Sequence, residues 1–211
     1  FLRTLVVALT LFSALVSSSA LGAEEPSKSI LFIATSNVPT GKFRLLNEIA
    51  APLGLKVEVR YVDKLPADTD AGLFTPYAAV FIDSYLQDYV KGRLSKALPG
   101  LKLPWVWLYR AQASFVQFPE ETAKRLLTHY SQGGRKNFEA FFKVLQAHLQ
   151  HRHFAGIPAP IIYPTQGIYH PLANGEIFSS VDSFKNWRVR QGQSVSARGS
   201  VVAILIHQQY L

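Results

Sequence analysis

The sequence predicts an α/β fold, in which an open and mostly parallel sheet carries helices on both faces. Residues 30–35 and 77–82 are short apolar runs bounded by polar residues, as in strands that are buried on both faces. Patterns with helical spacing follow these runs, so strands and helices alternate along the chain. This alternation favours a sheet of the flavodoxin or Rossmann-like type.

The first half of the chain predicts a strand–helix–strand unit. After residues 30–35 comes a helix with one apolar face, which Pro52 and Gly54 end. Residues 55–62 alternate between apolar and polar side chains, which predicts a strand with one wet face near an edge of the sheet. The apolar face of the helix consists of Phe43, Leu46, Ile49 and Ala50.

The second unit begins with the strand at 77–82 and continues with a helix that Asp83 or Ser84 is expected to cap. Residues 104–109 predict a fourth strand. Two helices follow, one opened by Pro119 and the acidic pair behind it, the other starting at Asn137. The apolar faces of the capped helix and of the last one consist of Leu86, Val90, Leu94 and Ala97, and of Phe138, Phe141, Phe142, Leu145 and Leu149.

Ligands of open parallel sheets sit beyond the carboxyl ends of the strands. Those ends are expected at residues 35–37, 82–84 and 109–110, where the chain offers hydroxyls, the carboxylate of Asp83 and the guanidinium of Arg110. Ordinary turn and capping chemistry is the alternative for Asp83 and Ser84.

Two further patterns are weak as site signatures. Residues 36–43 stand where a phosphate-binding loop would stand, but Phe43 replaces the hydroxyl residue that holds magnesium, so nucleotide binding is not expected. His148, His151 and His153 form a cluster in which His148 and His151 are three residues apart, a spacing that lets two helical side chains reach one metal ion. Zinc or iron binding is therefore one interpretation. The other is that these basic side chains stabilise the carboxyl end of a helix.

The N-terminus predicts export. Arg3 precedes a short apolar stretch and a run of small residues, as in a signal peptide covering residues 1–23. A buried helix or an uncleaved anchor is the alternative. The apolar stretch is shorter than the roughly 20 residues of a membrane span, and we expect no stable span after cleavage. Because of the signal peptide, we expect a periplasmic location. The chain lacks cysteine, so no disulfide stabilises the fold, which depends on packing alone.

The basic residues indicate what kind of partner is expected. The net charge is +8, but the lysines and arginines are scattered and form no nucleic-acid-binding motif. We therefore expect no nucleic acid as a partner. A basic surface favours acidic small molecules or anionic lipid heads, and the alternative is a merely solvated surface.

Near residue 155 the alternating strand and helix patterns give way to a proline-rich stretch. This change predicts a boundary between an N-terminal domain at 29–155 and the start of a second, incomplete α/β domain at 156–211. Residues 167–171 read Gly-Ile-Tyr-His-Pro. Behind them come Phe178, a helix at 179–189 with Trp187, and an apolar strand at 201–206. This passage resembles the large subunit of cobaltochelatase, CobN, and its relative, the H subunit of magnesium chelatase.

The resemblance implies that the chain is the N-terminal part of a longer protein that binds a tetrapyrrole and inserts or removes a divalent metal, cobalt, magnesium or iron. Such enzymes are ligases that form nitrogen–metal bonds, as in cobalamin biosynthesis. Cytoplasmic relatives use ATP through partner subunits, and no cofactor is expected in this part of the chain. An exported relative is instead expected beside a metal or haem uptake system, or other chelatase subunits. We expect this part alone to be inactive.

Three residues are candidates for the substrate site. Pro171 holds the backbone of His170 extended, and the imidazole of His170 is placed either to coordinate a metal or to donate to a ring carboxylate. Tyr169 is the second candidate and His207, at the end of the last strand, is the third. Alternatively, Tyr169 and His170 fasten the domain junction by packing and hydrogen bonds.

A second hypothesis belongs to another functional class. A non-catalytic periplasmic binding protein with two lobes, which catches a metal complex or an acidic solute between them, fits the same predicted elements.

Overall fold

The computed structural model describes residues 28–109, 114–164, 166–174 and 176–193. Its main element is a five-stranded sheet in the order β2-β1-β3-β4-β5, in which the first four strands run parallel and β5 pairs antiparallel with β4. The predicted open, mostly parallel sheet is confirmed, and β2 is an edge strand as expected. The strands are β1 (Lys28–Ala34), β2 (Leu55–Tyr61), β3 (Ala79–Asp83), β4 (Trp105–Trp107) and β5 (Ser114–Val116).

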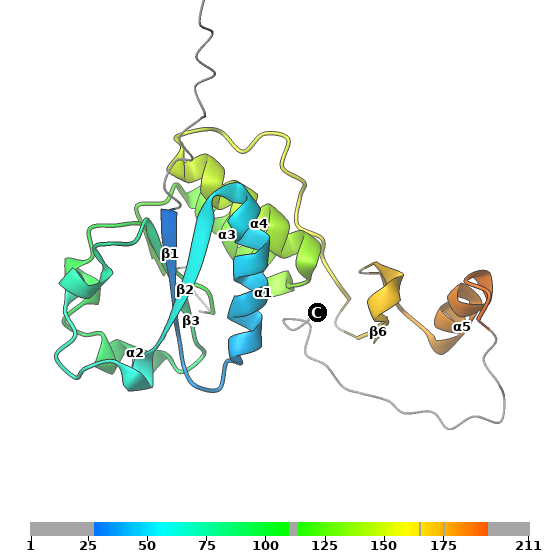
Figure 1. The fold of residues 1–211 in the computed structure, drawn as a ribbon, viewed down its shortest axis with the longest axis horizontal. Helices are drawn as coiled ribbons and strands as arrows, with labels where there is room; N and C mark the ends of the chain where they lie inside the picture. The colour runs from blue at the N-terminus through cyan, green and yellow to red at the C-terminus, as the bar shows by residue number, and fades with distance from the viewer. Residues whose placement is uncertain (1–27, 110–113, 165, 175, 194–211) are drawn as a thin grey trace, which may run out of the picture.

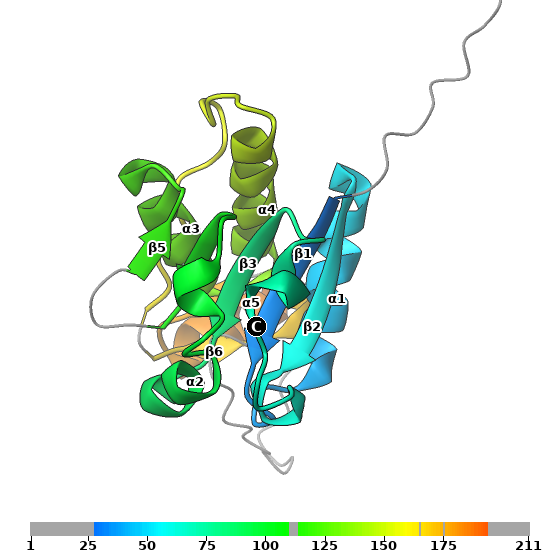
Figure 2. The same ribbon diagram turned by 90° about the vertical axis from the view of Figure 1, so that its left-hand side faces the viewer.

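Helices cover both faces of this sheet, as Figures 1 and 2 show. Three long helices lie on one face: α1 (Thr40–Ala50), α3 (Glu120–Gln132) and α4 (Arg135–Leu149). The other face packs against α2 (Gln87–Arg93) and short 3-10 turns. These turns are η2 (Val62–Lys64), η3 (Ala71–Phe74) and η4 (Leu98–Gly100), while η1 (Ala51–Leu53) extends α1.

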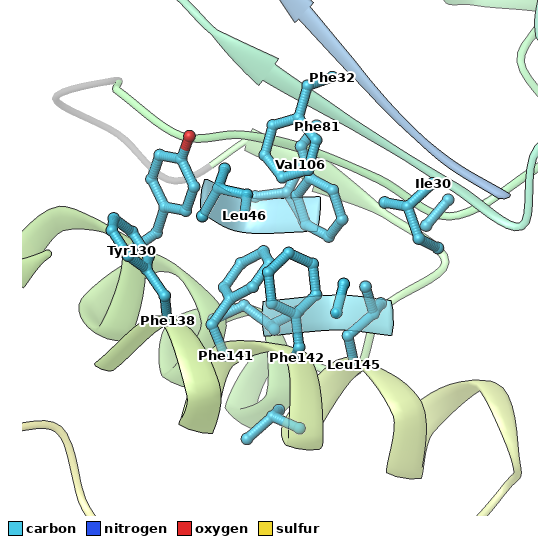
Figure 3. Packing of buried hydrophobic residues seen from close by; sticks show 14 of the residues in the cluster. Ile30, Phe32, Leu46, Phe81, Val106, Tyr130, Phe138, Phe141, Phe142 and Leu145 are labelled. Carbon is cyan, nitrogen blue, oxygen red and sulfur yellow. The ribbon is translucent and has the colours of Figure 1, made fainter. Parts of the chain in front are cut away.

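The two apolar runs of the sequence form the buried centre of the sheet. Alternate side chains of β1 go to opposite faces, so that Phe32 joins the cluster under α1, α3 and α4 while Leu31 joins the one under α2. Figure 3 shows the first cluster, in which the Phe141 ring lies 5.0 Å from the Phe81 ring and 6.5 Å from the Phe32 ring. The aromatic face predicted for the last helix thus fixes that helix on the sheet.

The sequence missed one strand and misplaced the start of two helices. The strand β5 was not predicted, because three residues in an edge strand leave no periodic signal. Helix α2 begins only at Gln87, and Leu86, expected in its apolar face, is 53% exposed. Helix α4 begins at Arg135, two residues before Asn137, because the Gly133–Gly134 pair already turns the chain at positive φ.

A second, smaller unit follows the connection at 157–164. It comprises β6 (Ile168–Tyr169), η5 (Pro171–Ala173), β7 (Ile177–Phe178) and α5 (Val181–Arg190), with β6 and β7 antiparallel. Figure 1 shows it to one side of the sheet. The predicted helix with Trp187 is confirmed, and Ser180 caps it through a capping box with Ser183. The expected signal peptide at 1–23 and strand at 201–206 lie outside the described residues.

No helix in the described part of the chain is both long and apolar enough to cross a bilayer.

Candidate functional site

The carboxyl edge of the sheet gathers the polar residues that follow β1 and β3. These two strands are neighbours, and the hydroxyl oxygens of Thr35 and Ser84 lie 3.4 Å apart. Thr35 also donates to the Asn37 side chain, and Ser36 to Asp63. The prediction that the first two strand ends meet is confirmed. Arg110, predicted for the third strand end, lies outside the described residues.

A buried ion pair lies at this edge. Lys42 Nζ is 3.1 Å from Asp83 Oδ2, and the two side chains are 3% and 1% exposed. Tyr130 also donates to Asp83 Oδ2, at 2.8 Å, and the Lys42 ammonium sits 4.6 Å from the centre of the Tyr130 ring. The pair therefore joins α1, the end of β3 and α3 in one network.

The structure corrects the role that the sequence predicted for Asp83. Its carboxylate pairs with Lys42 and Tyr130 and does not cap α2, whose first turn has no side-chain cap. Ser84 does take part in turn chemistry, since its hydroxyl accepts from Leu86 N–H at 3.0 Å. Lys42 was missed because it belongs to the rejected phosphate-loop pattern, although its spacing from Leu46 and Ile49 puts it on the apolar face of the helix, which was a detectable signal.

The electrostatics of Lys42 follow from its position. Burial lowers the pKa of Lys42 from its usual value, while the charge of Asp83 and the hydrogen bond to it act in the opposite direction. Two buried charges at the carboxyl edge of a parallel sheet are typical of ligand sites, but they are equally typical of structural networks whose partners are all satisfied. Here each charge has its partner within the fold.

The three histidines near the end of α4 do not converge. His148 packs against Phe118, with ring centres 4.6 Å apart, and His153 Nδ1 accepts from Ala155 N–H at 3.0 Å. His151 has a positive φ of 53° just beyond the helix. Among the described residues, no three His, Asp or Glu side chains stand close enough to hold a metal ion.

The second unit places the Tyr-His pair between a strand and a turn. Tyr169 pairs with Ile177 across β6 and β7, and His170 precedes η5. The His170 ring lies 5.1 Å from the Trp187 ring and 5.8 Å from the Phe184 ring. The predicted helix at 179–189 therefore forms one side of the surroundings of His170. His207, the third candidate, lies outside the described residues.

A hydrogen bond fixes the tautomer of His170. Its Nδ1 accepts from the Leu172 N–H at 3.2 Å, so in the neutral ring the proton is on Nε2. A metal bound at Nε2 requires the proton on Nδ1 instead, which would break this turn. Of the two roles that the sequence left open for His170, the hydrogen bond favours donation to an acceptor.

Gly167, the first residue of the motif, is required by close packing. A Cβ atom at this position would lie 2.2 Å from Ile177 Cγ2 and 3.2 Å from the Phe178 carbonyl oxygen. We expect Gly167→Ala to separate β6 from β7 and to raise amide exchange at residues 168–178, as measured by hydrogen exchange. Gly92→Ala is the matched control, because a Cβ atom there meets nothing within 4 Å. Equal exchange in both variants would contradict this packing role.

Two comparisons with known proteins found a similarity. Residues 127–211 match the family model CobN/Magnesium Chelatase. The solved catalytic subunit of cobaltochelatase from Mycobacterium tuberculosis is similar with 17% identity and a TM-score of 0.41, over 69% of this chain and 12% of that one. This chain thus spans about an eighth of that subunit. No curated protein matches. The resemblance seen in the sequence is confirmed over residues 127–211, which are similar to the CobN/Magnesium Chelatase family model.

Proposed function

We propose that this chain is the N-terminal part of a CobN-like chelatase large subunit that binds a tetrapyrrole and handles its metal after export to the periplasm. The observation that carries the proposal is the family match, which includes the whole Gly-Ile-Tyr-His-Pro unit. The net charge of +8 supports it, because the ring carries carboxylates. The metal is a substrate in this proposal, and cobalt, magnesium or iron fits it.

His170 is the residue that we assign to the ring. Its Nε2–H is left as a donor by the bond between Nδ1 and Leu172, and the neighbouring Trp187 and Phe184 rings hold the imidazole in place. A peripheral carboxylate of a tetrapyrrole is an acceptor of the right kind. The metal itself is then handled by other groups of the full-length protein.

Ring binding is tested by titrating the chain with haem, a metal-free porphyrin and a cobyrinate-like ring while following the Soret or corrin band. We expect a shifted, saturable band with at least one ring. In His170→Gln the dissociation constant should rise by about 10-fold or more, because the amide lacks the Nδ1 acceptor and the ring packing that orient the imidazole donor, and a charge-assisted hydrogen bond contributes roughly 1.5–3 kcal/mol when its donor is in place.

His153→Gln is the matched control, since His153 Nδ1 makes the same hydrogen bond to the N–H two residues on. It should bind as the unchanged chain does. No spectral change with any ring contradicts the proposed function as a whole. Binding that is unchanged in His170→Gln contradicts only the role of His170.

A further inference from the structure

The connection between the sheet and the second unit is held along its length by side chains of α3 and α4. Arg125 Nη2 donates to the carbonyls of Ile157 and Pro158, both at 2.8 Å. Asn137 binds both backbone groups of Ile161, accepting from its N–H and donating to its carbonyl, each at 2.9 Å. We call Arg125, Asn137 and Gln132 the clasp.

Gln132 completes the clasp close to the second unit. Its Oε1 accepts from the Tyr163 N–H at 2.9 Å. The Tyr163 ring lies against Gly134, where a Cβ atom would come within 3.0 Å of the phenol oxygen. Tyr163 is only a few residues before Gly167, so the clasp holds the connection almost as far as the Gly-Ile-Tyr-His-Pro motif.

A buried histidine stands behind the clasp. His129 is 0% exposed, and its Nδ1 lies 3.3 Å from Asn137 Oδ1. This oxygen already accepts from Ile161, so it is an acceptor for His129 as well, and the histidine proton is on Nδ1. Nε2 of His129 is buried and has no partner among the described residues. The neutral ring therefore fits this place and the charged ring does not.

We propose that the clasp positions the Tyr169–His170 unit and that His129 makes the clasp sensitive to acid, so that protonation of Nε2 releases the connection at 157–163. The added Nε2–H would be a buried donor without an acceptor, and the added charge would lie in a site that excludes water. This unfavourable free energy is removed when the hydrogen bonds between Asn137 and Ile161 break and water solvates the charged ring. An open groove of about 390 Å³ lies beside the connection and is lined by Arg125, Pro160 and Ile162 among others.

The charged groups around His129 support this direction. From α3, Arg125 adds a positive field that disfavours a second cation. From α4, the uncharged Asn137 faces the ring, and its side-chain oxygen also accepts from the Ile161 N–H of the connection. Burial is the main cause that lowers the pKa of His129, with Arg125 acting in the same sense and the bond to Asn137 opposing.

The pH dependence has a definite sign. An exposed histidine titrates near about 6.5, and the pKa of His129 in the closed clasp is below that value. The closed state is thus fully favoured above about pH 6.5, and this preference is lost as the pH falls through the lowered pKa of His129.

The test follows the Ile161 amide by NMR in the full chain between pH 7.5 and pH 4.5. We expect the protection factor of Ile161 to fall about tenfold or more as the pH is lowered, and the midpoint of this fall should equal that of the His129 imidazole titration. The Phe32 amide in β1 should stay protected. His129→Gln should abolish the pH response, and Asn137→Ala should leave Ile161 unprotected at both pH values.

His148→Gln is the control, because His148 also has a pKa lowered by burial but packs on Phe118, away from the clasp. It should respond to pH as the unchanged chain does. The proposal is overturned if Ile161 stays protected until Phe32 loses protection, or if His129→Gln keeps the response. Should His129→Gln not fold, different midpoints for Ile161 and His129 in the unchanged chain overturn it equally.

Discussion

Replacing Asp83 with alanine is expected to lower the free energy of unfolding by about 3–5 kcal/mol, the cost of leaving a buried charge without its partner. The Lys42 side chain, which is only 3% exposed, would have no carboxylate beside it, and the hydrogen bond from the Tyr130 hydroxyl to Asp83 would be lost. The loss is measured by urea denaturation followed by circular dichroism. An effect below about 1 kcal/mol would mean that the Lys42 ammonium reaches water and is not buried as described.

Two further variants separate the charge from the packing. Lys42→Met combined with Asp83→Asn removes both charges but keeps an acceptor for Tyr130, so it should recover most of the stability lost in Asp83→Ala. Lys56→Met breaks an exposed pair, in which Lys56 Nζ and Glu58 Oε1 are 2.7 Å apart and the Lys56 side chain is 58% exposed. Solvent screens that pair, and its loss should cost less than about 1 kcal/mol.

The sheet could be predicted because burial on both faces leaves a clear trace in the sequence. Residues 30–34 and 79–82 have no polar position, since both neighbouring layers are apolar, as is typical of parallel strands between helices. The three-residue β5 could not be predicted, because so short an edge strand carries no periodic pattern and is defined only by its pairing with β4.

The candidate sites were only partly predictable for a similar reason. That Asp83 lies at the edge of the sheet follows from its place after a strand, but its partner Lys42 is 41 residues away in sequence and nothing local connects them. In the same way, the pairing of Asn137 with Ile161 and His129 depends on how α3, α4 and the connection pack. By contrast, Phe178 and the helix with Trp187 follow His170 closely in sequence and were named by the family resemblance, but the packing of His170 against Phe184 and Trp187 was not predicted.

Replacing Trp187 with alanine is expected to unfold the second unit while the sheet stays folded. The buried core of that unit consists of Ala173, Phe178 and Trp187, and Trp187 is its largest member. Removing a buried tryptophan costs about 3–5 kcal/mol, which is as much as a core of this size supplies. Hydrogen exchange with mass spectrometry should show loss of protection in residues 166–193 and none in β1 or α1.

The same substitution tests how ring binding depends on the unit. The Trp187 ring lies 5.1 Å from the His170 ring, so the imidazole loses its support when the core is lost. Trp187→Ala should therefore weaken tetrapyrrole binding at least as much as His170→Gln does. Val189→Ala, on the same helix but 64% exposed, should change stability by no more than about 0.5 kcal/mol and leave binding intact. If residues 166–193 remain protected in Trp187→Ala, this aromatic core does not stabilise the unit, and His170 must be held by other contacts.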